Sequence, residues 1–485
     1  MSDTISNVCI GKEEKIWLGL VLLLIPISIL LGWATTLVGA RVILVVLLFP
    51  IALTIILNPL YGIMAYLALA PLYNIIAPLL PGVFQNLSRD LLLAIIVLGW
   101  IFNFLVRSYR KSSSFWNWKV LLVLFFTVLT LLQILNSESL LTGVIGFRIL
   151  FRCLPVYFVA VSLLNNEQRS KNMRLFFNAF LFGALINTLA GAIQFSTISL
   201  LQIMPAGTWF DPIRGASGFA ATRFGMYRAL GFFSDPNDFG QILVASLAIM
   251  LPRAIKENGK TNEKFYTAMC LISIFAIIGT LAAFAIFPAV LVLLLFFSSL
   301  TKGFVQKILI FLSIVSIVVI GIWFLDPDSS VTWAEYTNDQ VVNSFSYIPQ
   351  AIATGNWFGQ GYGVYLGLAE RLGISAGSTA DRATYWFYHD QITPQIGLLG
   401  MGIWTVLWIM FMYQGYQNQN RISQRESLDF QLYLGVWLSL IGIFVSSLHY
   451  GPYRVGGVDL LFYILWAFIS TEKIRKTPEV AKDYS

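Results

Sequence analysis

The chain contains only two histidines, His389 and His449, and each lies close to the end of a long apolar segment. A neutral imidazole can accept a proton from a hydroxyl, as a general base must. The positive end of a helix dipole favours that neutral form. We therefore interpret His389 as a candidate catalytic base, with the adjacent Asp390 and the distant His449 as secondary candidates. The alternative is a pair of interfacial histidines bound to backbone carbonyls.

A second motif runs from Arg228 into an apolar segment and reads Arg-Ala-Leu-Gly-Phe-Phe-Ser-Asp-Pro-Asn-Asp-Phe-Gly-Gln. Asp235 is expected to cap a helix whose first residue is Pro236. The free amides and the dipole at such a helix start attract anions. Arg228, with Arg223 just upstream, would complete an anion site there. The alternative is an ordinary capped helix whose neighbouring arginines touch lipid headgroups.

Further arginines fall near the same predicted face. Arg148 and Arg152 are four residues apart, which places them on one side of a helix, and we favour their lining a cavity over their reaching to the headgroups. Arg382 and Arg454 lie in predicted loops. Asp459 lies within the last apolar segment and needs a partner. Arg454 is the candidate by proximity.

The two basic residue types separate across the predicted membrane. All 13 lysines can be assigned to one side, which is cytoplasmic by the positive-inside rule and includes both termini. The opposite side then receives ten arginines and no lysine: Arg41, Arg89, Arg148, Arg152, Arg214, Arg223, Arg228, Arg371, Arg382 and Arg454. Arginine binds phosphate oxygens in pairs. Four of the ten have no motif around them and are interpreted as headgroup or loop contacts: Arg41, Arg89, Arg214 and Arg371.

The composition, 57% hydrophobic and 11% charged, indicates an all-α polytopic membrane protein with about 12–14 transmembrane helices. The predicted spans are 16–33, 42–57, 60–80, 89–106, 119–136, 147–164, 175–195, 237–253, 266–284, 285–300, 308–325, 391–414, 428–448 and 455–470. They form one integral membrane domain, 1–485. Two outer loops, about 196–236 and 326–390, are longer than plain connections require.

Other signals receive plainer interpretations. Gly355-Asn-Trp-Phe-Gly-Gln-Gly-Tyr-Gly363 is expected to form a tight turn rather than a nucleotide loop. Asp326-Pro-Asp328 is expected to mark a turn, so no metal site is predicted. The net charge of +7 is attributed to topology and contact with anionic membrane lipids rather than to nucleic acid.

Two of these motifs resemble the superfamily of O-antigen ligases and Wzy-type O-antigen polymerases, most strongly over about 180–415. The first resemblance is carried by Arg228, Gly231, Phe233, Pro236 and Asn237. The second is carried by His389, Asp390, Gly397, Leu398, Leu399 and Gly400, after the Gly-x-Gly-x-Gly turn.

The resemblance implies a GT-C-like architecture in the bacterial inner membrane and inverting glycosyl transfer at the periplasmic face. The donor would be a glycan on undecaprenyl diphosphate, and the acceptor a glycan or lipid-linked sugar, with no cofactor or metal. Arg228 would hold the diphosphate and His389 would activate the acceptor hydroxyl. The family's usual arginine is missing from the hairpin 279–287. Candidates to replace it are Arg223, Arg148, Arg152, Arg382 and Arg454.

Two other functions compete with glycosyl transfer. A transporter for a lipid-linked sugar or a small anion such as bicarbonate would be expected to have broken helices, a midplane site and repeated halves. The sequence contains no clear internal repeat. A non-catalytic partner of a polysaccharide export system is the third possibility.

Overall fold

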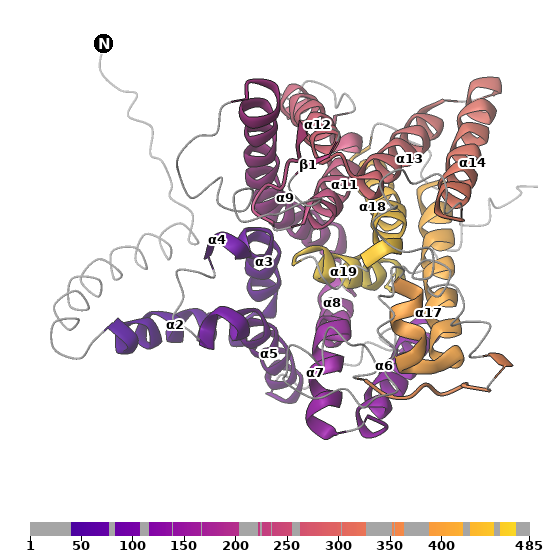
Figure 1. Ribbon diagram of the computed structural model, residues 1–485. Helices are drawn as coiled ribbons and strands as arrows, with labels where there is room; N and C mark the ends of the chain where they lie inside the picture. The colour runs from indigo at the N-terminus through magenta and orange to yellow at the C-terminus, as the bar shows by residue number, and fades with distance from the viewer. Residues whose placement is uncertain are drawn as a thin grey trace, which may run out of the picture.

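The computed structural model describes residues 40–76, 83–106, 116–137, 139–165, 167–202, 222–223, 226–233, 235–254, 262–301, 303–325, 352–353, 355–362, 388–420, 427–450 and 456–471. Helices make up nearly all of this part of the chain (Figure 1). The described residues also contain a pair of two-residue antiparallel strands, β1 (Thr222–Arg223) and β2 (Met226–Tyr227). The predicted all-α class is therefore confirmed.

The helices follow the apolar segments of the sequence. They are α2 (Ala40–Leu57), α3 (Pro59–Leu69), the 3-10 helix η1 (Ala70–Leu72), α4 (Tyr73–Ile76), α5 (Val83–Val106), α6 (Trp118–Leu135), α7 (Leu140–Phe151), α8 (Leu154–Leu164), α9 (Arg169–Gln194), the π-helical turn η3 (Phe195–Leu200), α11 (Pro236–Arg253), α12 (Asn262–Gly279), α13 (Ala283–Leu300), α14 (Phe304–Leu325), α17 (Tyr388–Asn420), α18 (Leu428–Tyr450) and α19 (Val458–Ser470). Every predicted span overlaps one or more of them, except 16–33, which lies outside the described residues.

Within the described ranges, six helices are long and apolar enough to cross a membrane, or seven if the bent pair α7–α8 forms one span. This supports a polytopic membrane protein without reaching the predicted count of 12–14. The count covers the described residues alone, and some of the described apolar helices are short. The predicted span 60–80, which contains α3, η1 and α4, is counted as one crossing helix over Pro59–Ile76, whereas α19 has only 13 residues. At about 1.5 Å per residue, α19 is shorter than the hydrocarbon core of a bilayer.

Helix α19 lies at the centre of the bundle, between the group α9, α11–α14 and α18 and the group α5–α8 (Figure 1). All of its residues are buried, as expected for a helix that is apolar on every side. Its rings pack directly on those of α17. Trp408 stacks on Phe462 with centroids 4.5 Å apart, and Phe411 stacks on Trp466 at 4.8 Å.

The two long loops have different ends in the structure from those predicted. The π-helical turn continues α9 to Leu200, so the first long loop begins after the predicted residue 196. Residues 203–221 lie outside the described residues. The second loop, 326–390, is described at 352–353 and 355–362, and its predicted end overlaps the start of α17 at Tyr388.

The two glycine motifs of the sequence meet in the structure. Gly397 interrupts α17 with φ 72° and ψ 176°, and the turn that contains Gly359 packs into this interruption. The amides of Leu398 and Leu399 donate to the carbonyls of Asn356 (3.2 Å) and Trp357 (3.0 Å). A Cβ on Gly397 would collide with the backbone of Gly359 and Trp357. The described part of the motif, 355–362, is thus a tight turn, as predicted, and it packs into the interruption of α17.

The same turn is fixed on the α6 side by Tyr362. Its hydroxyl donates to the Thr130 carbonyl (2.8 Å), and its amide donates to the Ser137 hydroxyl (2.7 Å). Burial raises the pKa of Tyr362 well above its ordinary value. The hydroxyl therefore remains protonated and able to donate at physiological pH.

Gly397→Ala should lower the unfolding midpoint of the detergent-solubilised protein strongly, because a Cβ has neither an allowed conformation nor space there. Gly402→Ala is the matched control in the same helix. A Cβ on Gly402 meets nothing within 4 Å, and helix propensity predicts a gain of up to about 1 kcal/mol. Equal midpoints for the two variants, measured by thermal unfolding, would contradict the described packing.

Candidate functional site

The Arg228 motif forms a buried segment, Arg228–Phe233, between β2 and α11. Side chains of α9 bind several backbone groups of this segment. Gln194 accepts from the amide of Leu230 (3.2 Å) and donates to the carbonyl of Gly231 (2.7 Å). Gly231 has φ 55°, a conformation that glycine adopts readily. The glycine of the motif therefore serves this turn.

A second side chain of α9, Asn187, also binds the backbone of this segment. Asn187 accepts from the amide of Phe232 (3.1 Å) and donates to the carbonyl of Pro71 in η1 (2.6 Å). Asn74 of α4 donates to the carbonyl of Phe232 (2.9 Å). The segment is thus held between α9 and the short helices η1 and α4. Buried backbone groups require such partners.

Arg228 lies against the hairpin that joins α12 to α13. Its side chain is buried, and its Nε donates to the carbonyl of Thr280 (2.8 Å). The amide of Ala229 donates to the carbonyl of Gly279 (2.7 Å). This hairpin is the one that lacks the expected arginine, and the structure brings the guanidinium of Arg228 to it.

The predicted start of α11 is confirmed. Asp235 is the N-cap and accepts from the amide of Asn237 (2.8 Å), and Pro236 occupies the first turn. The acid Asp238 also lies in that turn. The helix start thus already holds a carboxylate of the protein, which reduces its attraction for another anion.

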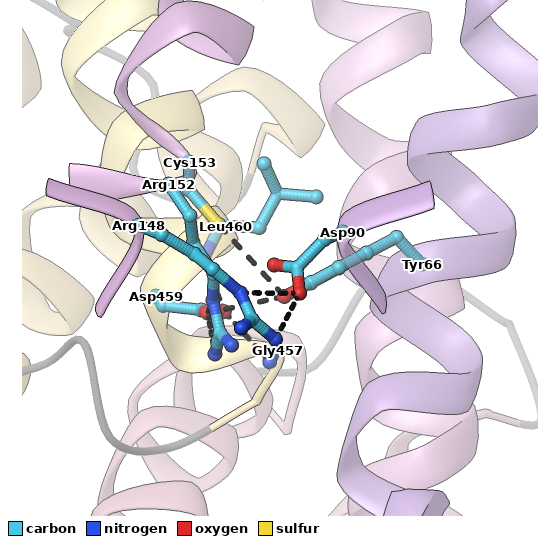
Figure 2. Close-up of polar contacts among 8 residues, drawn as sticks. All are labelled: Tyr66, Asp90, Arg148, Arg152, Cys153, Gly457, Asp459 and Leu460. Carbon is cyan, nitrogen blue, oxygen red and sulfur yellow. Dashed lines mark hydrogen bonds and ion pairs between the residues drawn. The ribbon is translucent and has the colours of Figure 1, made fainter. Parts of the chain in front are cut away.

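Arg148 and Arg152 each form an ion pair with a carboxylate (Figure 2). Arg148 binds Asp90 of α5 through Nη2 (2.6 Å) and Nε (2.8 Å). Arg152 binds Asp459 of α19 through Nη2 (2.7 Å) and Nε (3.1 Å). The side chains of the second pair are only 14% and 3% exposed, against 38% and 21% in the first. Both arginines therefore form helix-to-helix ion pairs, and their lining a cavity stays a prediction.

Asp459 has further partners at the start of α19. Its Oδ1 accepts from the amides of Gly457 (2.9 Å) and Leu460 (2.8 Å), and its Oδ2 accepts from the hydroxyl of Tyr66 (3.1 Å). A helix dipole favours a carboxylate in this position. The partner that Asp459 was expected to need is Arg152. Arg454, the candidate by proximity, lies outside the described residues.

The predicted span 147–164 is not one straight helix. It is a bent pair, α7 and α8, with an angle of 45° between them. Pro155 lies in the first turn of α8 and cannot donate the amide hydrogen that would continue α7. Arg152 lies at this break, and its pairing with Asp459 joins the bend to the central helix.

The structure places the remaining predicted residues without describing their side chains. His389 and Asp390 lie in the first turn of α17, His449 lies near the end of α18, and Arg223 lies in β1. Arg382 lies outside the described residues. The convergence of His389 with Arg228 therefore stays a prediction. His389 was expected at the start of a continuous span. The interruption at Gly397 instead separates it from most of the apolar helix, 395–420.

Sequence reasoning missed two carboxylate contacts. Asp90 was overlooked although it begins an apolar span, where an acid is costly unless paired. Tyr66 was overlooked because a tyrosine in an apolar segment carries no sign of its partner. The signal for Asp90 was present, since Arg148 lies in another apolar segment and has the opposite charge.

No family model matches the chain, and no curated protein matches it significantly. The resemblance drawn from the motifs is accordingly the ground for a functional proposal.

The Arg152–Asp459 pair should prove necessary for stability. Arg152→Met or Asp459→Asn alone should cost about 3–5 kcal/mol, because each leaves an uncompensated buried charge. The double variant should cost less than the sum of the two. The measurement is a double-mutant cycle in detergent unfolding.

The matched control is the pair Arg174–Asp429, at 3.2 Å, with side chains 35% and 58% exposed. The same cycle there should give about 0–1 kcal/mol of coupling. Equal coupling energies in the two cycles would refute the structural role of Arg152.

Proposed function

We propose that the protein is a membrane-embedded inverting glycosyltransferase of the O-antigen polymerase or ligase type. It would move a glycan from undecaprenyl diphosphate to a hydroxyl of a glycan or lipid-linked acceptor. The observation that best supports this is the buried position of Arg228 beside the α12–α13 hairpin. A cation held rigidly in an apolar bundle suits a reaction whose leaving group is a diphosphate.

The chemistry needs one base and one anion-binding group. The acceptor hydroxyl attacks the anomeric carbon, the bond from that carbon to the diphosphate oxygen breaks, and undecaprenyl diphosphate leaves with the bonding electrons. In the proposal, His389 takes the hydroxyl proton. Arg228 stabilises the charge that develops on the leaving diphosphate.

The local geometry of Arg228 favours such a role. The bond from Nε to the Thr280 carbonyl employs one of the five guanidinium donors and fixes the plane of the group. Charge interactions are stronger in a low-dielectric surrounding than in water. A preoriented guanidinium needs no rearrangement as the negative charge appears.

The ion pairs of Arg148 and Arg152 change which residues we propose as diphosphate ligands. Arg148 and Arg152 each bind a carboxylate of another helix. A diphosphate would have to compete with Asp90 or Asp459 for them. We therefore assign both arginines to the architecture and keep Arg228 as the principal diphosphate ligand.

Transport is the second candidate, and the bent pair α7–α8 favours it. Transporters place charged groups where helices break inside the membrane, and Arg152 lies at such a break. The repeated halves that accompany many transporter folds are not evident in the sequence.

Purified protein in lipid nanodiscs, supplied with an undecaprenyl-diphosphate-linked glycan and an acceptor glycan, should release undecaprenyl diphosphate. His389→Ala should lower turnover about 10²–10⁴-fold, as loss of a general base does. Arg228→Lys should lower it about tenfold or more, because an ammonium lacks the planar fork. Arg174→Ala, at the exposed pair, should retain the wild-type rate.

Unchanged turnover in His389→Ala would refute the proposed mechanism. Failure of the wild-type protein to consume matched donors, together with uptake of a labelled lipid-linked sugar or bicarbonate into proteoliposomes, would favour transport instead.

A further inference from the structure

Arg89 of α5 lies in a site formed by three separate parts of the chain. Its guanidinium carbon is 4.1 Å from the centre of the Tyr73 ring in α4. Its Nη1 would lie 2.8 Å from a Cβ on Gly456, in the turn before α19. The hydroxyl of Ser88 is 3.5 Å from that of Tyr73 and helps to hold the ring in place. The guanidinium is therefore enclosed rather than extended into the surroundings.

The charge of Arg89 is not balanced by the described residues. Ion pairs in that part of the chain involve Arg148, Arg152 and Arg174, and no described carboxylate lies within ion-pair distance of Arg89. Its Nε is buried and has no hydrogen-bond partner among the described residues. A buried donor of this kind is costly unless something accepts from it.

Asp90, the residue after Arg89, has a buried oxygen that could accept a hydrogen bond from the same ligand. Oδ2 of Asp90 binds Arg148, whereas Oδ1 is buried without a donor among the described residues. Nearby, Arg152 pairs with Asp459, which also accepts from the hydroxyl of Tyr66. Among the described residues, Arg148 and Arg152 each bind a carboxylate and Arg89 binds none. A ligand that carries an anion and a hydroxyl group would satisfy both orphan atoms.

The position along α5 indicates where such a ligand comes from. The predicted span 89–106 of this helix begins at Arg89, so Arg89 lies at the end of the apolar segment, where lipid phosphates are expected. Beyond it, Leu91 and Leu98 are 46% and 59% exposed, as expected for a helix that faces acyl chains. A phospholipid could place its chains along α5 and its phosphate at Arg89.

We propose that Arg89, Tyr73 and Asp90 form a binding site for an anionic phospholipid whose headgroup carries a hydroxyl. The phosphate accepts from the Arg89 guanidinium. The headgroup hydroxyl donates to Asp90 Oδ1. This site is distinct from Arg228 and does not depend on the proposed glycosyl transfer.

The test is a lipid titration of the delipidated full chain in detergent, with unfolding midpoint and native mass spectrometry as readouts. Phosphatidylglycerol, an anionic lipid with a hydroxyl-bearing headgroup, should bind and raise the midpoint, as any ligand of the native state does. Phosphatidylcholine should not. Arg89→Gln should weaken phosphatidylglycerol binding about tenfold or more, the loss expected for one charge-assisted hydrogen bond. Arg174→Gln, which removes an arginine elsewhere on the bundle, should leave binding unchanged.

Arg89→Lys provides a second variant if Arg89→Gln does not fold, and it should bind more weakly than the wild type because the planar fork is lost. Equal binding of phosphatidylglycerol and phosphatidylcholine, or unchanged binding in the Arg89 variants, would overturn the proposal. A matching effect of glycerol 3-phosphate alone would also overturn it, because the site would then recognise a soluble phosphate rather than a lipid.

Discussion

The ion pair between Arg152 and Asp459 is the interaction on which the arrangement of this bundle depends. It joins the break in α7–α8 to the first turn of the central helix α19. The opposite end of α19 is held by cations, because Lys119 and Arg169 donate to the carbonyls of Ile469 and Phe468. Acid at the start and cations at the end both match the helix dipole. A short buried helix is thereby fixed at both ends by charge.

The bend between α7 and α8 and the Arg152–Asp459 ion pair depend on each other. Pro155 interrupts the hydrogen bonds between α7 and α8, and the bend brings Arg152 against α19. An arginine in an apolar bundle is costly without a partner, and so is an aspartate. The pair satisfies both, with the Tyr66 hydroxyl as a further donor. Polar contacts thus determine which helices meet, and the aromatic stacking around Trp466 fills the space between them.

Local patterns in the sequence predicted local structure well. The apolar runs located the described helices, Asp235 and Pro236 marked the start of α11, and the glycine motif predicted a turn. Partners distant in the chain were not predictable in the same way. Arg152 and Asp459 are 307 residues apart, whereas proximity pointed to Arg454. The break at Gly397 was also missed, because a glycine inside an apolar helix is often tolerated without a kink.

The group that each arginine binds indicates whether the arginine stabilises the helix bundle or is a candidate for binding an anion. A guanidinium bound to a carboxylate, as in Arg148 and Arg152, presents little net charge to another anion. The Nε of Arg228 donates to a carbonyl, which helps to orient the group. Arg89 is oriented by an aromatic ring. These last two contacts converge on α4, where Tyr73 lies under Arg89 and the adjacent Asn74 holds the Arg228 segment. A rearrangement of this short helix would therefore act on both cationic positions at once.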